Sequence, residues 1–414
     1  MDDAPCPSFP GLSTMTPQPI YDKNVDEKEI KEEKNEIKDE IKDENEIKED
    51  NDDIQIDAKE LEFIEQPEIE IKTEEDLDKI TKDIEKIEIN DKLNEEAVLN
   101  KLKNTPFTKL EILSLNNLEL TSLDFLNNEC FKTLIVLEIK NTKISSLGKL
   151  NEAPLEELKV LDLSSNEISS LDILPQCKFK KLEILNLAEN KKIKELKPIK
   201  EAGFKELRKL DLSSNQIDDI NYLGDPSLSK LESLYLNDNQ ISDISVLEQT
   251  TFKNLKDLQL CNNKIENIDV FKNNDRFKEL EELQLSGNSI KSIDALSDSQ
   301  CGKLKLLNLS KNSITDIKAL SNVAFKNLEK LNLFDNKIEN IDEVFKAPPF
   351  NNTIEELDLS FNNLKSIDAL VDNKKFNKIK ELNIEGNSNL DYKDKKIMEL
   401  YNNYKIEYAF STLF

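Results

Sequence analysis

Residues 155–168, LEELKVLDLSSNEI, and residues 204–217, FKELRKLDLSSNQI, share the pattern L-x-x-L-x-L-x-x-N-x-I, and this pattern decides the fold. In the first stretch Leu161 and Leu163 alternate with Asp162, which is the period of a strand with one buried face. The Asn that follows is a residue type that hydrogen-bonds backbone groups in turns. Each copy therefore predicts a short strand that ends in a tight turn.

The pattern recurs twelve times between Phe107 and residue 390. Ten units carry the Asn, at intervals of 24 to 26 residues, while units one and two have Leu118 and Thr142 in its place. The ten residues are Asn166, Asn190, Asn215, Asn239, Asn263, Asn288, Asn312, Asn336, Asn362 and Asn387. One strand per unit, always in the same direction, predicts a parallel sheet of about twelve strands, roughly 55 Å along its curve at ~4.8 Å per strand.

The pattern resembles that of the leucine-rich repeat superfamily, and the resemblance covers residues 107–390. It implies an α/β fold, a right-handed solenoid or horseshoe with a parallel β-sheet on its concave side and helical caps at both ends. It also implies a protein that binds a partner protein, without catalytic residues, a cofactor or a metal ion.

Two columns of repeated residues are interpreted as scaffold rather than as a site. The Asn side chains are expected to bond backbone groups of the turns and to form an internal ladder. Phe residues that share one position are expected to stack along the convex side of the core. They are Phe107, Phe131, Phe179, Phe204, Phe252, Phe277, Phe325 and Phe376.

The two ends of the chain depart from the repeats, which predicts four parts: an acidic tail without fixed structure over 1–72, a helical cap over 73–106, the repeats over 107–390 and a second cap over 391–414. Residues 1–80 hold 28 Asp and Glu against 10 Lys and Arg, so they carry −18 of the net charge of −27. A short coiled coil is the alternative for the tail, because Ile30, Ile37 and Ile41 have helix-like spacing.

Both caps are predicted from apolar spacing. The first helix opens at Thr73 and has its apolar residues at helical spacing, at Leu77, Ile80, Ile84 and Ile87. A second helix is predicted from Asn94 to Thr105. The last cap is expected to contain a helix with Ile397, Leu400, Tyr401 and Tyr404 on one face, and then a strand with Ile406, Tyr408 and Phe410.

Composition narrows the classes of partner. The acidic balance argues against nucleic acid and anionic membranes, both of which favour Lys and Arg, and is compatible with a basic protein partner. Histidine, the commonest general base and metal ligand, is absent. The five scattered cysteines, the acidic and Pro-rich start and the lack of a long apolar run predict a reduced protein of the cytoplasm, with the nucleus as the alternative. We expect a monomer.

The strand face that does not contact the core is the candidate site. In the predicted register Tyr235, Phe334 and Phe361 project from it, the last two from neighbouring units, and Cys261 faces it as well. Exposed rings beside carboxylates are typical of a binding hot spot. The alternative is that each ring only covers neighbouring apolar surface. The predicted partner-binding residues are Asp162, Asp211, Tyr235, Asp257, Glu282, Phe334, Glu356, Asp358 and Phe361.

Three functions follow from these patterns. The leading hypothesis is an intracellular scaffold that binds a protein on the concave face. A narrower hypothesis is a regulatory subunit of a type 1 serine/threonine protein phosphatase, because the stretches at 265–271, 290–296 and 314–320 are similar to that subfamily, although its repeat units are typically shorter. The third is an extracellular or surface recognition protein, which suits the longer repeat unit with its Phe column.

Overall fold

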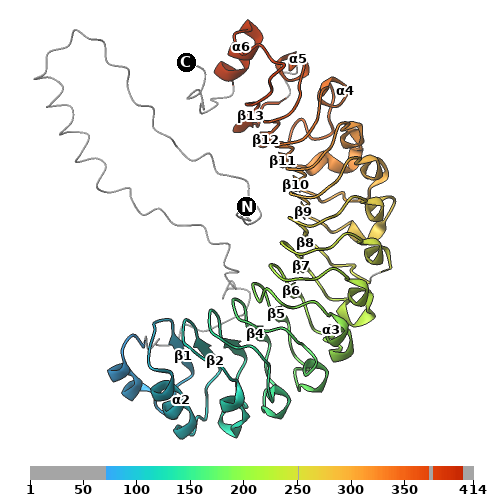
Figure 1. The fold of residues 1–414 in the computed structure, drawn as a ribbon. Coiled ribbons are helices and arrows are strands. Elements are labelled where there is room, and N and C mark those ends of the chain that lie inside the picture. Colours follow the sequence, from blue (N-terminus) through green and yellow to red (C-terminus); the bar gives the residue numbers. More distant parts are fainter. Residues whose placement is uncertain (1–70, 250, 373–375, 404–414) are drawn as a thin grey trace, which may run out of the picture. The chain divides into compact units, whose positions relative to one another are not determined.

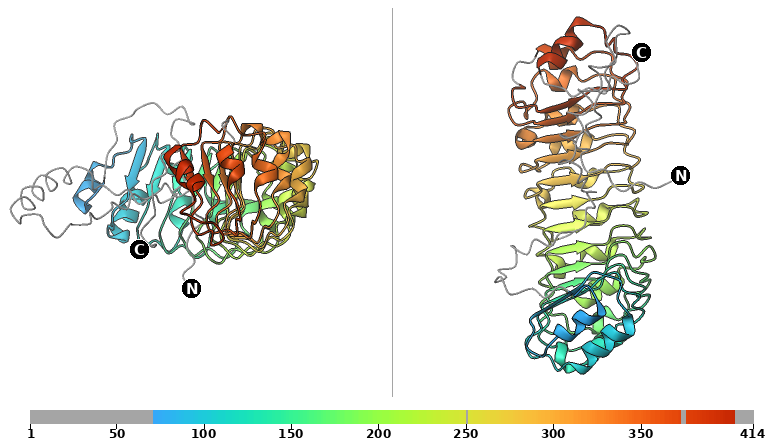
Figure 2. Two further views of the ribbon diagram at one scale, coloured as in Figure 1. Left: turned by 90° about the horizontal axis from the view of Figure 1, so that it is seen from above. Right: turned by 90° about the vertical axis from the view of Figure 1, so that its left-hand side faces the viewer.

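Thirteen short strands pair side by side in the order of the sequence, and every neighbouring pair is parallel. The structure, a computed structural model, describes residues 71–249, 251–372 and 376–403, which lie within one compact unit of the chain. The strands line the concave side of this array and the helical turns lie on its convex side (Figure 1). Viewed toward the strands, they form a ladder of parallel rungs (Figure 2, right). The predicted solenoid is confirmed.

The strands are three or four residues long, and each repeat contributes one. They are β1 (Lys86–Ile89), β2 (Ile112–Leu115), β3 (Val136–Glu138), β4 (Val160–Asp162), β5 (Ile184–Asn186), β6 (Lys209–Asp211), β7 (Ser233–Tyr235), β8 (Asp257–Gln259), β9 (Glu282–Gln284), β10 (Leu306–Asn308), β11 (Lys330–Asn332), β12 (Glu356–Asp358) and β13 (Glu381–Asn383).

The connections between strands carry short helices. Most are single turns of 3-10 helix: η1 (Glu74–Lys79), η2 (Asp124–Asn127), η3 (Glu129–Phe131), η4 (Leu150–Glu152), η5 (Leu174–Gln176), η6 (Asn221–Gly224), η7 (Pro226–Leu228), η8 (Ser245–Glu248), η9 (Asp269–Phe271), η10 (Asp275–Phe277), η11 (Asp294–Asp298), η12 (Lys318–Ser321) and η13 (Val323–Asn327). The α-helices are α2 (Glu95–Asn104), α3 (Lys197–Ala202), α4 (Asp342–Phe345), α5 (Asp368–Asp372) and α6 (Lys395–Asn403).

Strand β1 corrects the sequence prediction for the first cap. Ile84 and Ile87 have helical spacing, but the helix ends at Lys79 and residues 86–89 form a strand that pairs with β2. Ile87 and Ile89 are fully buried and alternate with half-buried residues, so a period of two applies here. A parallel neighbour supplies hydrogen bonds for this backbone, which a short sequence window does not reveal. The sheet therefore has thirteen strands rather than twelve.

The second predicted cap helix is confirmed as α2. The Asn94 side chain accepts a hydrogen bond from the backbone N–H of Ala97 at 3.0 Å and so caps the helix N-terminus. Val98 and Leu102 are fully buried on its inner face. This helix connects β1 to β2 and contacts η1 on one side and η2 on the other.

Each turn after β2 to β13 places one residue in the left-handed backbone region. This residue, which directly precedes the Asn position, has φ between 50° and 69°, and we call its place the turn position. Asn, Asp and Gly tolerate this conformation best. The turn positions are Asn117, Asn141, Ser165, Glu189, Ser214, Asp238, Asn262, Gly287, Lys311, Asp335, Phe361 and Gly386.

The Asn column joins each repeat to the one before it, as Asn239 illustrates. Its Nδ2 donates to the carbonyl oxygens of Leu236 and Asn237 in its own turn (3.2 and 3.0 Å) and of Leu212 in the preceding repeat (3.0 Å). Its Oδ1 accepts a hydrogen bond from the N–H of Ile217 at 2.9 Å. The same four bonds recur at Asn166, Asn190, Asn215, Asn263, Asn288, Asn312, Asn336, Asn362 and Asn387. The predicted scaffold role of the Asn column is confirmed.

The Phe column is buried in the core, as predicted, but it is completed by rings from outside the column. Phe107 contacts Phe131 within the column, with ring centroids 5.9 Å apart. Phe277 instead packs on Phe271 of helix η9, with centroids 4.8 Å apart. The convex side of the core is therefore built jointly by the Phe column and the connecting helices.

The C-terminal end of the array is closed by Tyr392 and helix α6. The Tyr392 hydroxyl accepts a hydrogen bond from the N–H of Asn387 (2.8 Å) and donates to the carbonyl of Ile384 (3.0 Å). Ile397 and Leu400 are buried, which confirms their predicted place on the inner face of a helix. The predicted strand over Ile406, Tyr408 and Phe410 lies outside the described residues, and so do residues 1–70 of the predicted tail over 1–72.

Candidate functional site

The side chains that point away from the leucine core form a surface that we call the strand face. Each repeat offers it three alternating positions; in the repeat of β8 the first is Asp257, the second Gln259 and the third Cys261, while Leu258 and Leu260 point into the core. Parallel pairing in register aligns each position into a column that crosses all the strands. Of the predicted site residues, the first column contains Asp257, Glu282 and Glu356, the second Asp162, Asp211, Tyr235 and Asp358, and the third Phe334. Phe361 occupies a turn position.

In most repeats the second position closes a local turn. The Asp211 carboxylate accepts a hydrogen bond from the backbone N–H of Ser213 at 2.8 Å, and Asp162 and Asp358 bond the residue two positions further on in the same way. Neutral amide side chains make the same bond at Asn186, Asn308, Asn332 and Asn383. The turn therefore requires an acceptor at this position but does not require a charge.

Three site residues are less exposed than the sequence predicted. Asp162, Asp211 and Asp358 were expected on an open acidic surface, but their exposed fractions are only 1%, 5% and 9%. Neighbouring strands stand ~4.8 Å apart, so a short side chain that folds back onto its own turn is covered by the adjacent repeats. Burial raises the pKa of all three carboxyls, and it raises that of Asp211 to about 6.

The three repeats of β7, β8 and β9 depart from this arrangement, because Tyr235, Gln259 and Gln284 fill the second position. The Tyr235 hydroxyl donates to Oδ2 of Asp257 at 2.7 Å, across the strand boundary. The Lys209 ammonium lies 5.0 Å from the centre of the Tyr235 ring, a cation–π contact. Tyr235 is thus tied to both neighbouring strands. Lys209 was not predicted, although its place in the first column next to Tyr235 could have indicated it.

Only one of the two carboxylate oxygens of Asp257 accepts hydrogen bonds from the described residues. Its Oδ2 also accepts a weaker hydrogen bond from Gln259 Nε2 at 3.4 Å, whereas its Oδ1 is buried without a hydrogen-bond partner among the residues that the structure describes. Burial and, to a smaller extent, the nearby carboxylate of Glu282 raise the pKa of Asp257 to about 6. Glu282 pairs with Asp257 in register on the next strand and is exposed. Asp257, Tyr235 and Glu282 therefore form one cluster.

Phe334 and Phe361 contact each other, as predicted. Their ring centroids lie 5.3 Å apart and the rings meet edge to face at 71°. Phe361 has an exposed fraction of 51%, although a ring that only covered neighbouring apolar surface would be largely buried. Phe334 is half-buried and supports it from the preceding repeat. We call these two residues the phenyl pair.

The backbone at Phe361 is unfavourable for its side chain. Its φ is +53°, and bulky residues seldom adopt this left-handed conformation. The next repeat makes room for the ring through Gly386, where a Cβ atom would lie 2.9 Å from ring atoms of Phe361. The role of Gly386 could not be predicted from the sequence, because it depends on contact with the neighbouring repeat.

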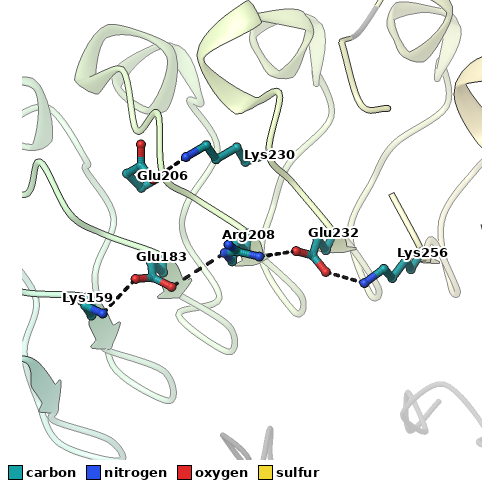
Figure 3. Close-up of polar contacts among 7 residues, drawn as sticks. All are labelled: Lys159, Glu183, Glu206, Arg208, Lys230, Glu232 and Lys256. Carbon is teal, nitrogen blue, oxygen red and sulfur yellow. Dashed lines mark hydrogen bonds and ion pairs between the residues drawn. The ribbon is translucent and has the colours of Figure 1, made fainter. Parts of the chain in front are cut away.

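Outside the strand face, charges largely compensate one another. The residues just before strands β4 to β8 alternate in sign and form a row of ion pairs, with Lys159 3.2 Å from Glu183, Arg208 2.6 Å from Glu232 and Glu232 2.7 Å from Lys256 (Figure 3). Within the first column, Glu356 is paired with Lys330 at 2.7 Å. Exposed pairs of this kind each contribute little stability, about 0–1 kcal/mol, but they neutralise the charges of the residues just before these strands.

The structure also corrects the prediction for Cys261. This residue was expected to be a reduced thiol that faces the surface, but it is fully buried and disulfide-bonded. Cys130, Cys177 and Cys301 are free thiols, and burial raises their pKa values, to about 12 for Cys177 and about 11 for Cys301. These three thiols are therefore poor nucleophiles.

In the described part of the chain, acidic and cysteine side chains nowhere gather into a group of three or more that could hold a metal ion. Nor does any of its helices combine the length and the apolar character needed to cross a bilayer.

Comparisons with known proteins agree with this architecture. Family models described as leucine-rich repeats match residues 156–201, 180–225, 205–249, 229–273, 278–338 and 350–369. The chain belongs to the leucine-rich repeat superfamily. No curated protein sequence matches it. The similarity to regulators of type 1 protein phosphatase stays a prediction.

Solved structures share the fold. An internalin (inlF) from Listeria monocytogenes superposes with a TM-score of 0.60 at 24% identity, over 77% of this chain and 87% of the internalin chain. A leucine-rich repeat protein from Leptospira interrogans gives 0.56 at 21% identity, over 78% and 90%. The ectodomain of an Arabidopsis thaliana receptor kinase in complex with CASPARIAN STRIP INTEGRITY FACTOR 2 gives 0.51 at 19% identity, over 73% and 38%. At these identities the similarity supports the fold alone.

Proposed function

We propose that this chain is a non-enzymatic scaffold that binds a basic protein partner on the strand face, as a monomer, in the cytoplasm or nucleus. Residues 107–390 form the binding unit in this proposal, and residues 73–106 and 391–414 cap it.

Phe361 is the single observation that carries the proposal. The other turn positions hold small, polar or charged residues, and several hold Asn or Gly, which suit the left-handed backbone. A Phe there costs about 1 kcal/mol in backbone strain and leaves half of an aromatic ring in water. Strained residues that the fold does not require are typical of functional sites. A partner that covers the phenyl pair would account for both features.

The charges of the strand face support a basic partner. Across β6 to β13 its three columns hold seven carboxylates and two lysines. The carboxylates are Asp211, Asp257, Glu282, Glu356, Asp358, Glu381 and Glu385, and the lysines are Lys209 and Lys330. A face with this excess attracts cationic segments and repels acidic ones.

The test begins with crosslinking mass spectrometry in the native cell, which identifies the partner and the crosslinked residues. The double variant Phe334→Ala/Phe361→Ala is then compared with the native chain for affinity to that partner. We expect a loss of affinity of about 30-fold or more, as for hot-spot aromatic residues, with an unchanged circular dichroism spectrum.

Val323→Ala is the matched control, because Val323 is an exposed apolar residue (79%) in helix η13, away from the strand face. Its affinity should equal that of the native chain. Equal affinity of the phenyl-pair variant, or crosslinks confined to the helical side of the array, would refute the proposal.

A further inference from the structure

A second charged surface lies at the residue that directly follows the Phe column. In six repeats this residue is an exposed lysine that lies four residues before a strand, and we call these six residues the lysine row. They are Lys132, Lys180, Lys205, Lys253, Lys278 and Lys326. Because the strands that follow them pair in register, the row crosses the repeats from that of β3 to that of β11.

The charges of the lysine row are not compensated by the residues that the structure describes. None of the six ammonium groups forms an ion pair or a hydrogen bond with them. The same position also contains one acidic residue, Glu156, but its carboxylate is paired with Lys178 at 3.9 Å. The row therefore presents six positive charges to the solvent.

The charged positions beside the lysine row are neutralised instead. Lysines at the next position each pair with a glutamate of the preceding repeat at 2.5 Å: Lys181 with Glu157, Lys230 with Glu206 and Lys303 with Glu279 (Figure 3 for Lys230 and Glu206). Two positions further on, the residues that include Lys159 and Glu183 alternate in sign and pair as well (Figure 3). A Lys-rich composition would affect all three positions alike, so it does not explain why only one of them is left with unpaired lysines.

The dimensions of the lysine row fit an extended acidic polypeptide. Eight strand spacings separate β3 from β11, about 38 Å at the sheet, so the six lysines lie on average about 8 Å apart. In an extended chain every second side chain points to the same side, at intervals of about 7 Å. Carboxylates at alternate residues of such a chain can therefore follow the row.

Other anions fit this surface less well. The glutamates beside the row, such as Glu157 and Glu206, would repel the broad anionic surface of a membrane but leave space for a single narrow chain. The net charge of −27 of the whole chain opposes nucleic acid, in which every phosphate is charged.

We propose that the lysine row binds an extended acidic segment of a second partner protein, in which Asp or Glu alternates with uncharged residues. This site shares no residue with the strand face and is independent of the function proposed above. With both sites occupied, the chain joins a basic protein on the strand face to an acidic protein on the lysine row, each selected by its charge.

Fluorescence anisotropy tests this proposal with a labelled peptide of about 12 alternating Glu and Thr residues, titrated with the full chain. We expect saturable binding at about 50 mM salt that weakens at least tenfold, roughly, at about 500 mM, because salt screens exposed charges. The variant Lys180→Gln/Lys205→Gln/Lys253→Gln should bind about tenfold more weakly, as expected for the loss of three exposed ion pairs.

The matched control removes the same amount of charge from lysines that follow the strands and are already paired. It is the variant Lys143→Gln/Lys194→Gln/Lys365→Gln, whose lysines pair with Glu119, Asp218 and Glu339. Its affinity for the peptide should equal that of the native chain, and circular dichroism should show both variants folded.

Several results would overturn the lysine row as a site for an acidic partner while leaving the strand-face proposal intact. They are the absence of binding at low salt, equal affinity of the row variant and the native chain, and an equal loss in both variants. Tighter binding of a single-stranded DNA of about 12 nucleotides would assign the row to nucleic acid instead. Carbodiimide crosslinks from the row to Asp or Glu of residues 1–66 in the same molecule, formed without peptide, would replace the partner protein by the chain's own acidic residues.

Discussion

Replacing Asp211 by Asn should stabilise this protein near neutral pH. The Asp211 carboxyl is 5% exposed, and its hydrogen bond to the Ser213 N–H is one that Asn makes equally well at Asn186 and Asn308. The carboxylate charge therefore adds nothing to the turn, yet it must be buried on folding. The amide keeps the hydrogen bond and removes the cost of burying the charge.

The magnitude follows from the shift in pKa. Burial raises the pKa of Asp211 from its ordinary 3.8 to about 6, so the folded chain binds the proton more tightly than the unfolded chain. Stability from this group is complete below pH 3.8 and is lost as the pH rises toward 6. A shift of about two units corresponds to about 3 kcal/mol at pH 7, which is the upper limit of the gain expected for Asp211→Asn.

Urea unfolding followed by circular dichroism at pH 4 and pH 7 measures the effect. We expect Asp211→Asn to raise the unfolding free energy by about 1–3 kcal/mol at pH 7 and to change it little at pH 4. Asp294→Asn, at an exposed carboxyl, should match the native chain at both values. An Asp211 variant that is less stable at pH 7, or a gain that is the same at both pH values, would refute the reasoning.

Three further predictions test the scaffold and the site. Phe361→Asn should keep or raise the stability by up to about 1 kcal/mol, because Asn suits the left-handed backbone, while it weakens partner binding; a clear loss of stability in urea unfolding would argue against strain at this position. Asn239→Ala should lower the free energy of unfolding by about 3–5 kcal/mol, because it leaves buried backbone groups in two repeats without their hydrogen-bond partner. A loss below about 1 kcal/mol in the same assay would contradict the bridging role of Asn239. Leu258→Ala or Leu283→Ala should each cost about 2–5 kcal/mol through a cavity, and calorimetry that finds an unchanged melting temperature would speak against full burial at these positions.

Much of the candidate site could be predicted from the sequence because the repeats share one register. The alternation around Leu161 and Leu163 decides which residues face the core, and the interval of 24 to 26 residues aligns equivalent positions of adjacent repeats. This register placed Phe334 and Phe361 in neighbouring repeats, and the structure shows their rings in contact. The hydrogen bond between Tyr235 and Asp257 joins two columns that the register also places side by side.

Burial and backbone strain could not be predicted, because both depend on the neighbouring repeats. Cys261 and Asp162 occupy the predicted positions, but their exposed fractions are only 0% and 1%. Ile84 and Ile87 have helical spacing, but residues 86–89 form a strand because β2 pairs with them as a parallel neighbour. Gly386 acquires its role only through contact with the ring of Phe361 in the preceding repeat.

The sequence by itself therefore determined the repeat, the direction of the strands and which strand residues face the core. These features follow from a local periodicity that recurs in every repeat. The tertiary structure alone decided which acidic side chains of the strand face are buried, that no described residue donates to Oδ1 of Asp257, and that Phe361 holds its ring outward at a cost in backbone energy. These properties depend on desolvation and packing between side chains that lie some 24 residues apart in the sequence. A local sequence pattern therefore does not predict them.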